Sequence, residues 1–173
     1  TELGFGRGLY RSRRRAAGHN ILIDQILAER YHVTAKIGEG GMGSVYKAND
    51  LKLNSEVVIK TPHAALIKDA EFAARFRREI RSLVQLSHAH IVKVMDVGVH
   101  DGLPFAVMQY LPGGSLEDRQ RPCDPTEILE WLNDIADALD FMHQRGLIHR
   151  DVKPANILLD ESGRAYQIGR APV

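Results

Sequence analysis

The stretch GEGGMGSVYKAND, residues 38–50, constrains the fold of this chain more than any other segment. Gly38, Gly40 and Gly43 spell G-x-G-x-x-G, a spacing found in two unrelated phosphate-binding designs. A dinucleotide-binding fold needs a strand before these glycines and a helix directly after them. The residues before the glycines suit a strand. Those after them do not suit a helix, because the polar pair Asn49-Asp50 follows Val45 and Tyr46 closely, and EVVIK at 56–60 is again strand-like. The pattern therefore predicts a glycine-capped hairpin followed by a third strand, a flap that folds over nucleotide phosphates.

The bulk composition excludes several classes of protein. A length of 173 residues favours one domain or one large fragment, and no apolar run is long enough to cross a membrane. The net charge of +1 gives no reason to expect nucleic acid or a membrane surface as a partner. The single cysteine, Cys123, excludes an internal disulfide framework and fits a reducing compartment, so we expect a cytoplasmic location. His88 and His90 lie close together, but no cysteine or second histidine pair completes a zinc set.

Residues 1–30 are expected to form an irregular basic tail or a piece of upstream sequence. A mitochondrial-type or nucleic-acid signal is the alternative interpretation of the arginines in RGLYRSRRRAAGHN.

Lys60 ends an apolar strand, and it needs a partner because burying a bare ammonium is costly. Residues 69–86 are predicted to form a helix with Asp69 as its N-cap. Glu79 falls on the inward, apolar face of that helix and is the candidate partner of Lys60. A glutamate that pairs with an arginine of its own helix is the alternative.

The second half of the chain is expected to change from strands to a helix. Residues 90–116 indicate two strands joined by the turn HDGLP, and LPGGSL then breaks the chain as a hinge between lobes would. A long helix is predicted near 125–144, with Asp124 as N-cap and Glu127 as capping-box acid. Its apolar face comprises Ile128, Leu132, Ile135, Leu139 and Met142. The elements that would cover this face are expected to be missing from this chain, so it should leave an exposed apolar patch.

The segment IHRDVKPANILLD, residues 148–160, places three residue types of phosphoryl-transfer chemistry in one loop. Asp151 could orient an acceptor hydroxyl and take its proton, Lys153 could neutralise charge on the transferred group, and Asn156 could hold a metal.

Together these motifs resemble the eukaryotic-type protein kinase family, in the Ser/Thr form common in bacteria, from about Tyr31 to about Arg164. The resemblance implies an α+β kinase domain over 31–173, incomplete at its end. Its N-lobe, 31–111, would be a five-stranded antiparallel sheet with one helix, and 112–173 would begin a helical C-lobe.

The resemblance also implies ATP and Mg²⁺ as cofactors, and transfer of the γ-phosphoryl group to Ser or Thr hydroxyls of a protein that the sequence does not identify. Lys60 would bind the α- and β-phosphates and pair with Glu79, Asp151 would be the catalytic base, Lys153 would contact the γ-phosphate, and Asn156 would bind Mg²⁺. The residues implied to bind nucleotide are Ile37, Gly38, Glu39, Gly40, Gly41, Met42, Gly43, Ser44, Val45, Lys60, Met108, Gln109, Leu111 and Leu158, with Met108 as gatekeeper.

One departure from the family is abrupt. The family has an Asp-Phe-Gly triplet at the position where this chain has Gly169-Arg170-Ala171, and no aspartate follows Asp160. We therefore expect a C-terminally truncated kinase domain with little activity, and a downstream reading frame that encodes the missing motif. A non-catalytic nucleotide-binding module and a small-molecule kinase of the same broad fold remain the alternatives.

Overall fold

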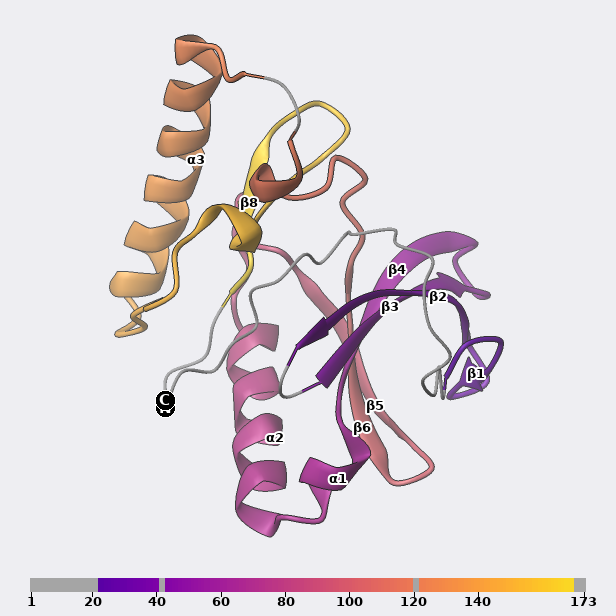
Figure 1. The fold of residues 1–173 in the computed structure, drawn as a ribbon. Helices are drawn as coiled ribbons and strands as arrows, with labels where there is room; N and C mark the ends of the chain where they lie inside the picture. Colours follow the sequence, from indigo (N-terminus) through magenta and orange to yellow (C-terminus); the bar gives the residue numbers. More distant parts are fainter. Residues whose placement is uncertain (1–21, 41–42, 120–121, 170–173) are drawn as a thin grey trace.

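The computed structural model of this chain describes residues 22–40, 43–119 and 122–169. Its main feature is an antiparallel sheet in the order β1-β2-β3-β4-β6-β5 (Figure 1). The strands are β1 (Ile26–Leu27), β2 (Tyr31–Gly40), β3 (Gly43–Asp50), β4 (Ser55–Pro62), β5 (Val94–His100) and β6 (Leu103–Gln109). A separate two-stranded sheet pairs β7 (Ile157–Leu159) with β8 (Ala165–Gln167).

The glycine motif forms a hairpin, as predicted. β2 ends at Gly40 and β3 begins at Gly43, and these two residues are register partners. β3 continues as a strand and pairs along its length with β4, so no helix follows the glycines. A second hairpin joins β5 to β6 through Asp101 and Gly102, whose positive φ angles of 49° and 77° suit a tight two-residue turn.

The sheet has one strand more than predicted, because β1 pairs with the start of β2. Residues 22–25 and 28–30 are turns and irregular chain, so only the two-residue strand at Ile26–Leu27 departs from the expected irregular segment, and residues 1–21 lie outside the described part of the chain. Leu27 is buried in the core, and Arg30 donates hydrogen bonds of 2.9 and 2.7 Å to the buried carboxylate of Asp50. A two-residue strand is too short to show a periodicity, so composition alone suggested a tail.

Two helices follow β4. The short α1 (Ala64–Ile67) precedes α2 (Ala70–Val84), whereas the sequence predicted a single helix over 69–86. Asp69 is the N-cap of α2, as predicted, since its carboxylate accepts hydrogen bonds from the backbone N–H groups of Glu71 and Phe72 at 2.8 and 3.2 Å. The buried face of α2 packs into the main core and comprises Ala73, Phe76, Ile80 and Leu83.

The long helix α3 (Pro125–His143) begins with the predicted capping box. Asp124 accepts from the backbone N–H of Thr126 at 2.8 Å, and its own N–H donates to Glu127 at 3.2 Å. Of the predicted apolar face, Ile135 and Met142 are buried, whereas Ile128 and Leu132 are 41% and 59% exposed, as expected of an apolar face left without its partners. In the described part of the chain α3 packs against β7 and β8, and the helix residues buried there are Trp131, Asp134, Ile135, Ala138 and Met142.

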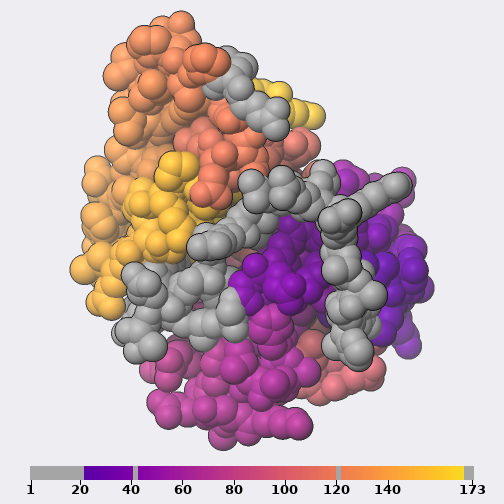
Figure 2. All heavy atoms as spheres, viewed as in Figure 1, coloured from indigo at the N-terminus to yellow at the C-terminus, as the bar shows by residue number. Residues whose placement is uncertain are grey.

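The chain between β6 and α3, and the chain between α3 and β7, each contain one turn of 3₁₀ helix, η1 (Leu116–Asp118) and η2 (Pro154–Asn156). Figure 1 shows α2 lying along the main sheet and α3 at the top of the view, with β8 between α3 and the sheet. Figure 2 shows that the described chain divides into two lobes. The orange and yellow surface of α3 and β7–β8 lies above the magenta and indigo surface of α2 and the main sheet. None of the described helices combines the length and the hydropathy needed to cross a bilayer.

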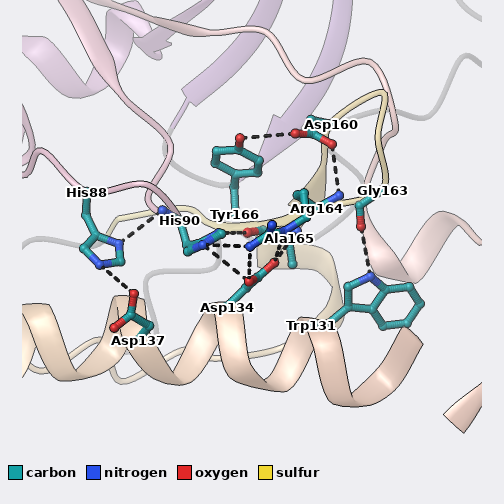
Figure 3. Close-up of polar contacts among 10 residues, drawn as sticks. All are labelled: His88, His90, Trp131, Asp134, Asp137, Asp160, Gly163, Arg164, Ala165 and Tyr166. Atoms are coloured by element: carbon teal, nitrogen blue, oxygen red, sulfur yellow. Dashed lines mark hydrogen bonds and ion pairs between the residues drawn. The ribbon is translucent and has the colours of Figure 1, made fainter. Parts of the chain in front are cut away.

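A polar network joins the segment between α2 and β5 to α3 and β8 (Figure 3). The Nε2 atoms of His88 and His90 lie 3.2 and 3.3 Å from carboxylate oxygens of Asp137 and Asp134 on α3. Arg164 donates to Asp134 through Nη2 and Nε at 2.7 and 3.0 Å. Asp134 is almost fully buried, and its ion pair with Arg164 joins α3 to the chain between β7 and β8. The contacts of His88 and His90 with Asp137 and Asp134 are polar links from this lobe to the segment between α2 and β5.

Burial alone would raise the pKa of the Asp134 carboxyl, but the hydrogen bond from Arg164, with smaller contributions from the Ala165 N–H and His90, outweighs it and lowers that pKa. A lowered folded-state pKa contributes stability that is complete above the unfolded-state value and is lost as pH falls through the folded-state value. We expect Asp134→Asn to lower the free energy of unfolding by about 1–3 kcal/mol at neutral pH, with the deficit shrinking below roughly pH 4.

Urea denaturation at several pH values between 7 and 3 measures this difference. Asp140→Asn, at an exposed position of the same helix, is the matched control and should change stability little. A deficit in Asp134→Asn that stays constant down to pH 3 would contradict the electrostatic origin of the stabilisation.

Candidate active site

The glycine hairpin is held by a close approach of backbone to backbone. Gly43 on β3 is the register partner of Pro62 on β4. A Cβ atom added to Gly43 would lie 2.3 Å from the backbone oxygen of Thr61 and 2.9 Å from the Cα of Pro62. Glycine is therefore required at this position for packing rather than for a special φ angle. Gly41 and Met42, also predicted to bind nucleotide, lie outside the described residues.

An apolar cluster brings together parts of the chain that are distant in sequence. Five of the residues predicted to bind nucleotide belong to one core cluster: Ile37, Val45, Met108, Leu111 and Leu158. Backbone hydrogen bonds attach β7 to the chain after β6, since Gly113 N–H donates to Leu159 at 2.9 Å and Leu159 N–H donates to Gly114 at 2.8 Å. Val45 on β3 and Leu158 on β7, expected on opposite sides of an adenine ring, are thus held in one cluster.

Lys60 lies in the middle of the sheet beside this cluster. It is half-buried, and its register partners are Val45 on β3 and Ala106 on β6. Among the described residues no ion pair joins Lys60 to Glu79, although Lys60 has another interaction. Nor does Glu79 pair with an arginine of its own helix, where Arg75 pairs with Glu71 instead.

Glu79 lies at the edge of the buried face of α2. That face comprises Ala73, Phe76, Ile80 and Leu83, and Glu79 is only half-buried beside it. At about 100° of rotation per residue, Glu79 is directed about 40° from Leu83 and about 60° from Phe76 but about 100° from Ile80. The helical position alone therefore does not prevent a pair with Lys60.

The three polar residues of the loop after α3 converge on one carboxylate. The Nδ2 of Asn156 donates to the backbone oxygen of Asp151 at 2.8 Å and to its Oδ2 at 3.0 Å. The Nζ of Lys153 lies 3.2 Å from Oδ1 of the same carboxylate. The structure therefore brings together Asp151, Lys153 and Asn156, as the sequence predicted.

His149 fixes the backbone of this loop. The ring is almost fully buried, its Nε2 lies 2.6 Å from the backbone oxygen of Ile168, and its Nδ1 accepts from the backbone N–H of Asp151 at 3.3 Å. Nε2 must carry the ring proton, since a carbonyl can only accept. Arg150, between His149 and Asp151, has a φ of 62°, which turns the chain sharply at this point.

Gln167 is a polar contact of this loop that the sequence interpretation missed. It is fully buried, and its Nε2 donates to the backbone oxygens of Asn156 at 3.1 Å and Ile168 at 3.3 Å. The Ile168 oxygen is also the acceptor of His149 Nε2, so the two side chains share one acceptor. The alternation of Ala165, Tyr166 and Gln167 along a strand could have placed Gln167 on the buried side.

Gly169 occupies the position where the family resemblance implies a second metal ligand, and glycine has no side chain that could bind a metal. Gly169 is buried, and a Cβ atom built on it would lie 2.8 Å from Cδ2 of Leu83 and 3.4 and 3.5 Å from atoms of Leu86 and Ile91. The described residues contain no group of three or more His, Cys, Asp or Glu side chains suited to a metal ion. Asn156 is thus a single predicted ligand, and the described residues do not fit a Mg²⁺ site shared by two side chains.

Comparison with known proteins gives a consistent result. Residues 31–169 match the family model described as a protein kinase domain. The chain is 41% identical to the serine/threonine-protein kinase PknB of Mycolicibacterium smegmatis over 145 residues, which is 80% of this chain and 23% of that protein. It is 39% identical to the serine/threonine-protein kinase PrkC of Bacillus subtilis over 146 residues, 83% of this chain and 22% of that protein. The chain thus spans less than a quarter of the length of these curated relatives.

Replacement of Gly43 tests the geometry of the hairpin. We expect Gly43→Ala to lower the free energy of unfolding by about 1–3 kcal/mol, because the new methyl group would overlap the Thr61 carbonyl and push β3 away from β4. Thermal denaturation followed by circular dichroism measures the change, with Ser55→Ala at the exposed start of β4 as the control. Equal melting midpoints for Gly43→Ala and the unaltered chain would show that the strands are not in such close contact.

Proposed function

The chain belongs to the protein kinase domain family, and we propose that it carries the ATP-binding surface and the acceptor-activating loop of a serine/threonine-protein kinase. The observation that supports this most strongly is the apolar cluster that unites Val45, Met108, Leu111 and Leu158 beside Lys60. These residues come from the flap, the sheet, the chain after β6 and β7, and the adenine ring would lie between Val45 and Leu158. The substrate would be a protein hydroxyl, in keeping with the names of its relatives.

The loop residues have complementary roles in this proposal. Asp151 would orient the acceptor hydroxyl and take its proton, because both of its carboxylate oxygens are already held in place, Oδ1 by Lys153 and Oδ2 by Asn156. Lys153 would also contact the γ-phosphate, and Lys60 would bind the α- and β-phosphates. Glu79 would be the partner of Lys60 in the nucleotide-bound state, although no ion pair joins the two in this structure.

A second candidate function is a nucleotide-binding module that does not transfer phosphate. Gly169 favours this alternative, because the family uses an aspartate there and a glycine supplies no carboxylate. Both candidates require ATP to bind, and they differ in how strongly Mg²⁺ supports binding and transfer. We place the protein in the cytoplasm in either case, on the argument from its single cysteine.

Nucleotide binding is tested by the thermal midpoint of the chain with and without ATP. We expect millimolar ATP to raise the midpoint, since a ligand that binds only the folded state stabilises it by mass action. Lys60→Met should abolish the rise by removing the phosphate-binding cation. Lys52→Met, in the exposed turn between β3 and β4, is the control and should keep it. An unchanged midpoint at saturating ATP would refute both candidate functions.

The metal dependence of that shift separates the two candidates. We expect the ATP-induced shift of the unaltered chain to be nearly the same in Mg²⁺ and in EDTA, because Asn156 is a single amide ligand. Gly169→Asp should create a Mg²⁺-dependent increase, since a charged carboxylate is too costly to leave among Leu83, Leu86 and Ile91 and would turn towards Asn156. Gly169→Ala controls for the added Cβ. A strong Mg²⁺ dependence in the unaltered chain would instead favour a working kinase site.

A further inference from the structure

The residue between β4 and α1 contacts the glycine hairpin directly. The Nε2 of His63 lies 2.8 Å from the backbone oxygen of Gly40, the last residue of β2. We propose that His63 is a positioning residue that holds the glycine hairpin against the junction of β4 and α1 and so sets the height of the flap over the nucleotide. The role in nucleotide binding rests on the proposed function, whereas the restraint on the hairpin does not.

The two strands of the hairpin meet this junction at neighbouring points. On the returning strand, Gly43 packs against the backbone of Thr61 and Pro62, so closely that no side chain fits. On the outgoing strand, Gly40 is the register partner of Gly43 and presents its carbonyl to His63, the next residue after Pro62. Three consecutive residues, 61–63, therefore contact both strands at the last register pair of the hairpin, Gly40 and Gly43.

The backbone around His63 leaves its side chain available for this contact. His63 occupies the N-cap position of α1, with φ −65° and ψ 135°, yet its side chain makes no capping hydrogen bond. Its own carbonyl accepts from Leu66 N–H at 2.9 Å, so the start of α1 is satisfied by backbone. Pro62 before it has a fixed φ and no N–H group, which limits the paths that the chain can take here. The imidazole is thus directed to the hairpin rather than to the helix.

The chemistry of the contact fits a restraint that persists over a wide pH range. A carbonyl oxygen accepts, so the Nε2 of His63 must carry a proton, and it does so in one neutral tautomer and in the imidazolium. A hydrogen bond of ordinary net strength changes a local opening equilibrium by roughly fivefold. The hairpin has no other side chain contact of this kind among the hydrogen bonds of the described residues.

Amide hydrogen exchange of the complete chain without nucleotide tests the restraint. We expect His63→Ala to speed exchange in the segment 38–46 by about fivefold, because the hairpin opens more often. His63→Gln should restore most of the protection, since its side-chain amide can donate to the same carbonyl. His143→Ala, at the exposed end of α3, is the control and should leave exchange unchanged.

The distribution of the effect distinguishes a local restraint from general destabilisation. Exchange in β5 and β6 should be equal in all four proteins, since neither strand is bonded to the hairpin through His63. Unchanged exchange in 38–46 for His63→Ala would overturn the proposal. A rise of the same size in β5 and β6 would overturn it as well, because the histidine would then act on the whole fold.

A fluorescent ATP analogue, mant-ATP, tests the connection to the nucleotide site. Stopped-flow displacement by excess ATP should show a dissociation rate several-fold higher for His63→Ala than for the unaltered chain and for His63→Gln. An unchanged dissociation rate would overturn the role of His63 in nucleotide retention. If the unaltered chain does not bind mant-ATP at all, the proposed function fails, and the exchange measurements alone decide whether His63 restrains the hairpin.

Discussion

The structure depends on a continuous apolar cluster that crosses from the main sheet to β7 and α3. Val45 and Met108 from the sheet share this cluster with Leu158 from β7 and Met142 from α3, and all four are at least nine-tenths buried. Burial of such side chains contributes about 1.5–3 kcal/mol each, so separating the two lobes would expose side chains whose burial stabilises the chain. The proposed nucleotide surface lies at one border of this cluster.

The loop that we propose to activate the acceptor is held together independently of the position expected to bind metal, so one can be intact while the other is incomplete. Asp151 is held by Lys153 and Asn156 within its own loop, and the loop rests on buried His149. None of these contacts requires a carboxylate at Gly169, whose Cβ direction leads to the apolar side chains of the α2 region. Preorganised polar groups at Asp151 are thus compatible with weak metal binding.

Local signals in the sequence predicted most of the fold correctly. The glycine hairpin, the N-cap Asp69 and the capping box at Asp124 each depend on a few neighbouring residues, and the structure confirms them. The errors concern positions that depend on what packs against them. The expected ion pair between Lys60 and Glu79 is not formed, and β1 adds a strand that was not expected. Both depend on the tertiary arrangement, which a helical stripe or a two-residue strand does not specify.

Methyl-resolved NMR with ATP titrated into the isotope-labelled chain tests the central claim most directly. The account predicts that the methyl signals of Val45, Met108, Leu111 and Leu158 shift together at one saturating concentration, because these side chains line one nucleotide surface. The exposed methyl groups of Val97 and Val99 on β5 should not move. Shifts confined to β5, or no shift in the cluster at saturating ATP, would contradict the assignment of this surface to nucleotide binding.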